Sequence, residues 1–270
     1  MVSIPIVAAL AVFAALCIIL PAAIFVICHR RMMLSWRNIL IGAGVFFVFS
    51  QVIEKSMHLY LLQLNPATAA WLNGSAIVYA LYGCLAAALF EEIGRYLGMR
   101  FLVRPTGNPG TAVAYGIGHG GLEAILIGLS VLNLFIYAVM LNTGHFDALL
   151  GLGVPPKTVA QLRVGLQHQT ITPLVLGSVE RLCALLIQIG LSLVVWRAVE
   201  RRRPAWLGLA IVLHAAVDFL PGLAQKGQIW AAQVNTGLML IIAVALAVIF
   251  LRGLPGRASV SAARDAETAA

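Results

Sequence analysis

Long hydrophobic stretches alternate with short polar connections along almost the whole chain. A transmembrane α-helix needs about 20 predominantly apolar residues. About seven stretches meet this length, at roughly 4–28, 39–62, 74–99, 111–141, 172–196, 205–223 and 229–251. None has the alternating ten-residue pattern of a transmembrane β-strand. The pattern therefore predicts an all-α, polytopic membrane bundle of about seven transmembrane helices.

The connections between the predicted spans are short except for 143–171, and the chain ends in a segment of different composition. Residues 143–171 mix leucine and valine with Pro155, Lys157 and Arg163, which predicts an amphipathic surface helix from about 156 to 168. The segment after Pro255 is small, polar and alanine-rich, so we expect it to be disordered. The predicted organisation is one transmembrane domain over 1–254 and a cytoplasmic tail over 255–270.

Composition and charge support a membrane location and argue against a nucleic-acid partner. The chain is 61% hydrophobic and 10% charged, and its net charge is +8. Most of its arginines follow the odd-numbered spans, at Arg30, Arg31, Arg37, Arg100, Arg104, Arg197, Arg201, Arg202, Arg203, Arg252, Arg257 and Arg264. By the positive-inside rule, this asymmetry places the N-terminus outside and the C-terminus in the cytoplasm. We therefore expect a multi-pass protein of the cytoplasmic membrane, surrounded by lipid, with no nucleic-acid partner; the sequence indicates no oligomeric state.

Six of the ten acidic residues lie inside the predicted spans, where a charge is costly. On insertion scales, a carboxylate at the centre of a bilayer costs roughly 3 kcal/mol, so such groups usually face the bundle interior or a wet cavity. The six are Glu54, Glu91, Glu92, Glu123, Glu180 and Asp218. Their concentration indicates chemistry or ion movement inside the membrane.

One group of ionisable residues is Glu91, Glu92 and Arg95. Arg95 lies four residues after Glu91 and three after Glu92, so on a helix it can pair with either carboxylate. A purely structural pair would leave the second carboxylate unexplained. The functional alternative is that Arg95 holds one glutamate while the other activates water or binds a cation.

Two histidines each precede an acid by one helical turn. His119 is followed by Glu123, and His214 by Asp218. In each pair the carboxylate can orient the imidazole and fix its tautomer, although a membrane histidine can also serve only as a hydrogen bond between helices. Glycines surround His119 and allow either close helix packing or a local break.

The three groups are predicted to lie at one depth in the membrane. Glu91, His119 and His214 lie nine or ten residues from the cytoplasmic end of their spans. At 1.5 Å per residue this is about 13–15 Å, near the middle of a hydrocarbon core about 30 Å thick. Nearer the outer face, Glu54–Lys55 and Glu180–Arg181 are expected to be structural ion pairs, with an access path as the alternative. Gln188 is expected to hydrogen-bond between helices.

The segments that carry these groups resemble a known family. The sequences Phe90-Glu-Glu-Ile-Gly-Arg-Tyr96, Gly116-Ile-Gly-His-Gly-Gly-Leu-Glu-Ala124 and His214-Ala-Ala-Val-Asp-Phe219 resemble the YhfC family of intramembrane metalloproteases. They are more distantly similar to the superfamily of CAAX prenyl proteases and bacteriocin-processing proteins. That superfamily usually has three residues between the glutamate pair and the arginine, whereas two intervene here, and Tyr115 stands where a phenylalanine is usual.

The resemblance implies an intramembrane endopeptidase with catalytic residues Glu91, Glu92, His119 and His214. Arg95, Glu123 and Asp218 would be supporting residues, Glu123 and Asp218 by holding the two imidazoles. A zinc ion held by Glu92 (or Glu91), His119 and His214 would leave one position open for water; a metal-free Glu/His mechanism would use the same residues. The sequence leaves both forms open, as well as which glutamate is catalytic.

The resemblance also implies the partner, a membrane-embedded or membrane-proximal peptide substrate. Two other functions remain open from the residues themselves. Paired carboxylates and His-x-x-x-acid turns also suit a transporter of divalent cations or protons, although no inverted repeat is evident. A non-catalytic membrane scaffold is the third possibility.

Overall fold

A computed structural model describes residues 1–103 and 107–253, and these form helices joined by short connections. In chain order the helices are α1 (Ile4–Met32), α2 (Trp36–Phe46), η1 (Phe47–Glu54), α3 (Lys55–Leu59), η2 (Tyr60–Leu64), α4 (Pro66–Asn73), α5 (Ala76–Gly98), η3 (Met99–Val103), α6 (Gly110–Asn142), α7 (Ala148–Gly151), α8 (Pro156–Gln167), α9 (Ile171–Glu200), α10 (Ala205–Gln225) and α11 (Ile229–Gly253). The elements η1, η2 and η3 are π-helical. The predicted tail, 255–270, lies outside the described residues.

The helical membrane bundle predicted from the sequence is confirmed. Within the described residues, six helices are long and apolar enough to cross a membrane, and α11 contains a shorter apolar segment, Trp230–Leu246. One of the six, 36–64, is built from α2, η1, α3 and η2 in succession. The surface helix predicted at 156–168 corresponds to α8, which buries Val159 and Leu166.

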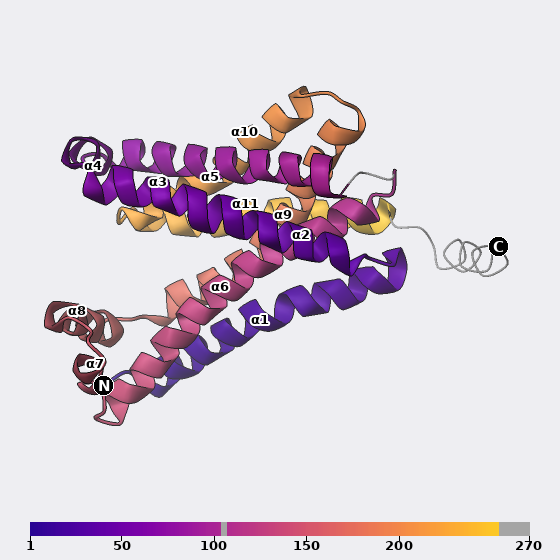
Figure 1. Ribbon diagram of the computed structural model, residues 1–270. Helices are drawn as coiled ribbons and strands as arrows, with labels where there is room; N and C mark the ends of the chain where they lie inside the picture. Colours follow the sequence, from indigo (N-terminus) through magenta and orange to yellow (C-terminus); the bar gives the residue numbers. More distant parts are fainter. Residues whose placement is uncertain (104–106, 254–270) are drawn as a thin grey trace.

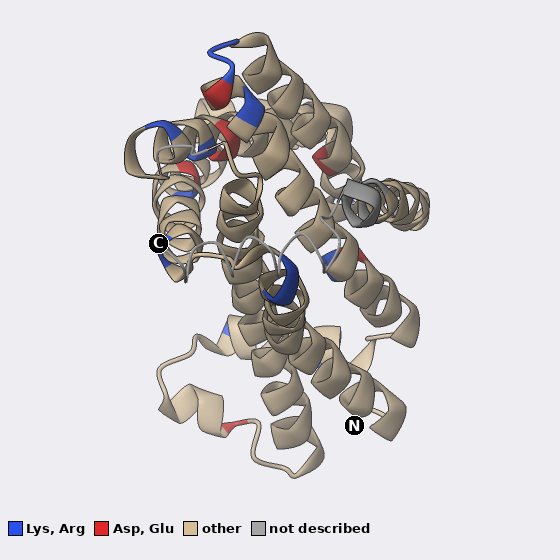
Figure 2. Cartoon of the chain, turned by 90° about the vertical axis from the view of Figure 1, so that its right-hand side faces the viewer, with Lys and Arg blue, Asp and Glu red and all other residues tan. Residues whose placement is uncertain are grey.

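The connections between α1 and α2 and between α9 and α10 lie together with η3 at one end of the bundle (Figure 1), and arginines lie in or directly beside all three. There, Arg37 at the start of α2 donates a hydrogen bond to the carbonyl of Leu102 in η3. Figure 2 looks onto this end and shows how few charged positions the bundle contains. At the opposite end, Asn142 bonds the backbone of Val2, and Lys226 reaches Asn73. We call these the arginine-rich end and the α4 end.

Helix α6 lies at the centre of the packing, against α1, α2 and α9. Its glycine segment is continuous helix, so the glycines serve close packing and not a local break. A Cβ at Gly118 would collide with the backbone carbonyl of Ile39 in α2, and one at Gly120 would lie 2.8 Å from the Cβ of Gln188 in α9. These glycines let α2 and α9 approach His119 from two sides.

Apolar side chains close the bundle on the arginine-rich side of the predicted site. Met99, Tyr115, Trp196 and Ala210 are all buried and belong to one hydrophobic cluster. Each lies one helical turn from a polar residue of the same helix, toward the arginine-rich end. On this side, the polar residues therefore border buried, predominantly apolar side chains.

Candidate functional site

Glu91 lies at the centre of a buried polar cluster formed by α5, α6, α9 and α10. Its Oε2 atom is 2.9 Å from His119 Nε2 and 3.9 Å from His214 Nε2. The amide of Gln188 donates to the same oxygen over 3.3 Å. Three helices thus direct a nitrogen at one carboxylate oxygen, and Glu91 as a whole residue is 7% exposed.

Glu92 has the different role of an internal counterion. Its Oε2 atom lies 3.1 Å from Nε of Arg95, and both side chains are fully buried. Its Oε1 atom is 2.7 Å from Nδ1 of His214. A carboxylate only accepts hydrogen bonds when ionised, so Nδ1 of His214 is the donor and Nε2 faces the other way. Of the two partners left open by the sequence, the structure pairs Arg95 with Glu92.

Arg95 joins the cluster to α9 and α6. Its guanidinium donates to the carbonyl and side-chain oxygens of Gln188 and to the hydroxyl of Ser192. It also lies 3.2 Å from Nε2 of His119. Because a guanidinium remains protonated in proteins, it fixes a positive charge inside the bundle. We call Glu91, Glu92, Arg95, His119, Gln188 and His214 the central cluster.

Glu123 does not hold His119, contrary to the expectation from their spacing. Its carboxylate instead lies 3.0 Å from Arg181 and accepts a hydrogen bond from Gln188 over 3.1 Å. Nδ1 of His119 is buried without a hydrogen-bond partner in the part of the chain that the structure describes. A guanidinium on the facing helix compensates a carboxylate better than a neutral imidazole does, so Glu123 faces α9.

Asp218 does contact His214, as the spacing predicts. The Oδ2 atom lies 3.2 Å from His214 Nε2. The Asp218 side chain is 35% exposed, against 4% for His214. Asp218 is thus the member of the site that reaches out of the buried cluster.

Sequence reasoning underestimated α9. Gln188 was expected only to link helices, yet it contacts Glu91, Arg95 and Glu123, and Ser192 was not considered. The available signal was spacing, because Arg181, Gln188 and Ser192 recur at helical intervals in one span. Of the two expected structural pairs, neither forms: Lys55 bonds Gln51, and Glu180 bonds Asn235 and Thr236.

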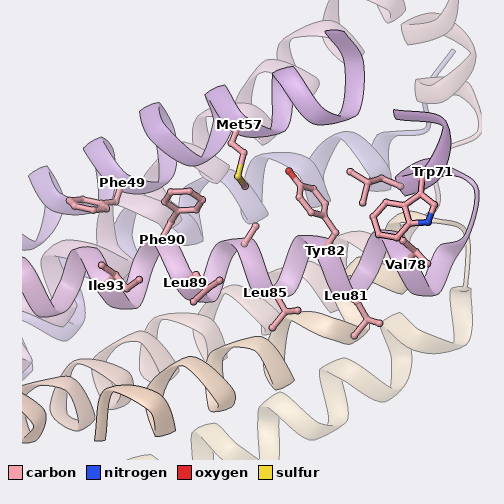
Figure 3. A pocket seen from close by; sticks show the side chains of 12 residues that line it. Phe49, Met57, Trp71, Val78, Leu81, Tyr82, Leu85, Leu89, Phe90 and Ile93 are labelled. Atoms are coloured by element: carbon pink, nitrogen blue, oxygen red, sulfur yellow. The ribbon is translucent and has the colours of Figure 1, made fainter. Parts of the chain in front are cut away.

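Two hollows lie against α5. The larger, about 790 Å³, is an apolar groove between α5 and the 36–64 helix, lined by Phe49, Met57, Trp71, Leu72, Val78, Leu81, Tyr82, Leu85, Ala86, Leu89, Phe90 and Ile93 (Figure 3). The smaller, about 340 Å³, is lined by Glu54, His58, Leu62, Tyr79, Tyr82, Gly83, Cys84, Ala87, Asp218, Pro221, Gly222 and Gln225. We call the second hollow the polar chamber; it shares Asp218 with the site.

Fold and site together define a polytopic helical membrane protein with glutamates, histidines and an arginine buried at one level. Comparison with known families identifies the family of the chain. The model of the YhfC intramembrane metalloprotease family matches residues 16–241, so the chain belongs to the YhfC family. It is 41% identical over 239 residues to the uncharacterized membrane protein YhfC of Bacillus subtilis (strain 168), covering 88% of this chain and 92% of that protein. No solved structure matches significantly.

The family description implies a metal, and the cluster can be tested for one. Carboxylate and imidazole are suitable zinc ligands, but neither predicted set, with Glu92 or with Glu91 beside His119 and His214, is arranged to hold a metal among the described residues. Glu92 is committed to Arg95 and to Nδ1 of His214, and the Arg95 guanidinium lies beside Nε2 of His119. Among the described residues, no three His, Cys, Asp or Glu side chains are arranged to hold a metal ion. This arrangement does not fit a bound metal.

Proposed function

We propose that the protein is an intramembrane endopeptidase in which Glu91 and His119 activate water. One observation carries the proposal: Glu91 Oε2 faces Nε2 of both His119 and His214, while Glu92 is separately neutralised by Arg95. Two adjacent carboxylates thus have different surroundings, a usual basis for different chemical roles. The family description supports peptide hydrolysis as the reaction.

In the first step, Glu91 acts as the general base. Its carboxylate takes a proton from a water molecule, and the water oxygen bonds to the carbonyl carbon of the peptide. The 2.9 Å separation allows the proton to be shared between Glu91 Oε2 and His119 Nε2. The hydrogen bond from Gln188 fixes the orientation of the carboxylate.

In the second step, His214 stabilises the oxyanion and Glu91 protonates the leaving amine. Glu92 holds Nδ1, so Nε2 points to the side where Glu91 and Asp218 lie. A proton on Nε2 stabilises the tetrahedral oxyanion. The proton gained by Glu91 then passes to the amide nitrogen as the C–N bond breaks. Glu92, Arg95 and Asp218 are positioning residues in this scheme.

The location of the cluster supports a substrate in or beside the membrane. Every histidine and glutamate of the central cluster lies within an apolar span. A peptide must therefore enter the bundle, which favours a membrane-embedded or membrane-proximal segment. The arginine asymmetry supports the cytoplasmic membrane as the location, and the shared packing of the helices supports a single domain over 1–254.

The finer assignments depend on resemblance. Glu91, Glu92, His119 and His214 occupy the positions that similarity to CAAX prenyl proteases assigns to catalysis. The family description favours a metal without specifying which, and the donor types suit zinc, while the guanidinium inside the cluster favours the metal-free form. We propose the metal-free form, because Arg95 already supplies the positive charge at His119.

The experiment compares cleavage with transport. Purified wild-type protein, Glu91→Gln and Glu180→Gln are reconstituted in liposomes and incubated with a membrane proteome. Glu180→Gln is the matched control, because Glu180 is a glutamate in a span that bonds only α11 residues among those described. We expect new peptide termini with the wild type and the control, and a loss of about 10²–10⁴-fold in Glu91→Gln. Proton or metal flux that depends on Glu91, without new termini, would instead establish the transporter.

A further inference from the structure

The polar chamber has the position of an entrance to the central cluster. Asp218 lines it and also contacts His214 over 3.2 Å. Toward the arginine-rich end, in contrast, Met99, Tyr115, Trp196 and Ala210 form a buried apolar layer. This contrast favours the chamber side over the arginine-rich side as the approach for water and substrate.

The chamber extends along α5 and α10 toward the α4 end. From α5 it is lined by Tyr79, Gly83, Cys84 and Ala87, all of which precede Glu91 in chain order. From α10 it is lined by Asp218 and by residues that follow it. Since α5 begins and α10 ends at the α4 end, both walls run outward from the cluster (Figure 1). The positive-inside prediction places this end outside the cell.

Glu54 gives the chamber an unused acceptor. It ends the π-helical segment η1 and is 6% exposed. Its Oε1 atom lies 3.1 Å from His58, whose other nitrogen lies 2.7 Å from the hydroxyl of Tyr82. Its Oε2 atom is buried and has no partner among the described residues. An unpartnered buried carboxylate oxygen costs free energy, and a donor from a ligand would remove that cost.

The charges around the chamber select the ligand. Two carboxylates, Glu54 and Asp218, line it, and neither lysine nor arginine is among the described residues that do. Lys226 lies at the α4 end, where it is held by Asn73 and lies over the Tyr79 ring, 4.3 Å from its centroid. A cationic donor therefore fits better than an anion or an apolar side chain.

We propose that the polar chamber is the substrate entrance, open toward the α4 end, and that it binds a lysine or arginine side chain of the substrate peptide through Glu54 and Asp218. The term substrate rests on the proposed peptidase function. The guanidinium or ammonium group would donate to the free oxygen of Glu54, which brings the neighbouring peptide bond toward Asp218 and the central cluster.

The first test uses Cys84, a native thiol in the chamber wall, and needs no proteolysis. Cys17, Cys28 and Cys183 are replaced by alanine, and Cys84 is treated with a cationic and an anionic methanethiosulfonate reagent of similar size. After correction for rates with a free thiol, we expect the cationic reagent to react at least about tenfold faster. Glu54→Gln should reduce this ratio several-fold, and Glu180→Gln should leave it unchanged. A chain that retains only Cys183, which does not line the chamber, should show no such ratio.

Sidedness is tested with the same Cys84-only chain in sealed right-side-out and inverted vesicles. The impermeant cationic reagent should label Cys84 only from the side on which the α4 end lies, located by a cysteine placed at Asn73. Labelling from the arginine-rich side, equal rates for the two reagents, or no labelling by either reagent would each overturn the proposal. Thermal unfolding in detergent verifies that each variant is folded.

A second test separates this proposal from the proposed function. Peptides that the wild type cleaves are paired with versions in which lysine near the cleaved bond is replaced by norleucine. We expect kcat/KM to fall at least about tenfold for the norleucine peptide in the wild type, and to differ little between the pair in Glu54→Gln. Equal cleavage by the wild type refutes the chamber's role and leaves the peptidase standing. Charge-selective labelling without any cleavage refutes the peptidase and supports the chamber as a cation entrance.

Discussion

The central cluster and the wall of the polar chamber use similar residues in opposite ways. In the central cluster, Glu92 is neutralised by Arg95, and the guanidinium is shared with Gln188. On the chamber wall, one oxygen of Glu54 contacts His58, which in turn contacts Tyr82, and both of these side chains can be neutral. The other oxygen of Glu54 has no hydrogen-bond partner among the described residues. Both glutamates are almost fully buried.

The difference lies in whether the counterion belongs to the protein. A buried ion pair is a fixed structural unit, and removal of one partner is strongly destabilising. A buried carboxylate that lacks a permanent cation weakens the fold and is available to a ligand. We therefore expect the central cluster to contribute to stability and the chamber wall to contribute to binding. Substitutions in the two regions can measure these contributions separately.

The largest effect is expected from Arg95→Met. This change leaves Glu92 buried without its cation and should destabilise the protein by about 3–5 kcal/mol. Unfolding in detergent by denaturant measures the effect. Adding Glu92→Gln to Arg95→Met should recover part of the loss, because the uncompensated charge is removed. A loss below about 1 kcal/mol for the single variant would contradict the assigned role.

Gln188→Leu should have an intermediate effect. Its side chain bonds two carboxylates and the guanidinium of Arg95. Hydrogen bonds to charged groups contribute about 1.5–3 kcal/mol each, but leucine keeps the packing volume, so we expect a total loss within that range. Gln233→Leu serves as the control for an amide on α11. An equal loss in both variants would show that the position within the cluster is unimportant.

Glu54→Gln should change stability least among the acidic positions. It removes a charge that has no arginine or lysine partner among the described residues, so the free energy of unfolding should be unchanged or rise by up to about 1 kcal/mol. The same denaturant titration compares it with Glu92→Gln, which should be clearly destabilised. If Glu54→Gln were the more destabilised of the two, the contrast between the two regions would be reversed.

Chelation should have the smallest effect. If Arg95 provides the positive charge of the cluster, peptide cleavage should change less than about twofold after treatment with a strong chelator. Elemental analysis of protein purified without a His tag should give metal well below one equivalent per chain. One equivalent of zinc that is lost on chelation together with activity would establish the metal-dependent form.

The sequence predicted the fold more completely than the contacts of the site. Hydrophobic length located the spans, because crossing a membrane imposes a strong constraint on helix length. Spacing within one helix correctly joined His214 to Asp218 and allowed Arg95 to meet Glu92. It failed for Glu123, whose partner Arg181 lies on another helix. Contacts between helices depend on their rotation and on small residues such as Gly120, which one sequence does not reveal.

The pairing of Glu92 with Arg95 also bears on how the protein is made. Both residues lie on α5, three positions apart, so this helix brings its own counterion when it enters the bilayer. Two isolated charges would each add roughly 3 kcal/mol to insertion, whereas a pair formed within the helix reduces that burden before any neighbour is present. Glu91 has no such partner on α5, and its contacts come from α6, α9 and α10, all synthesised later. The reactive carboxylate is therefore completed only when the last of these helices has joined the bundle, which ties chemical competence to the end of assembly.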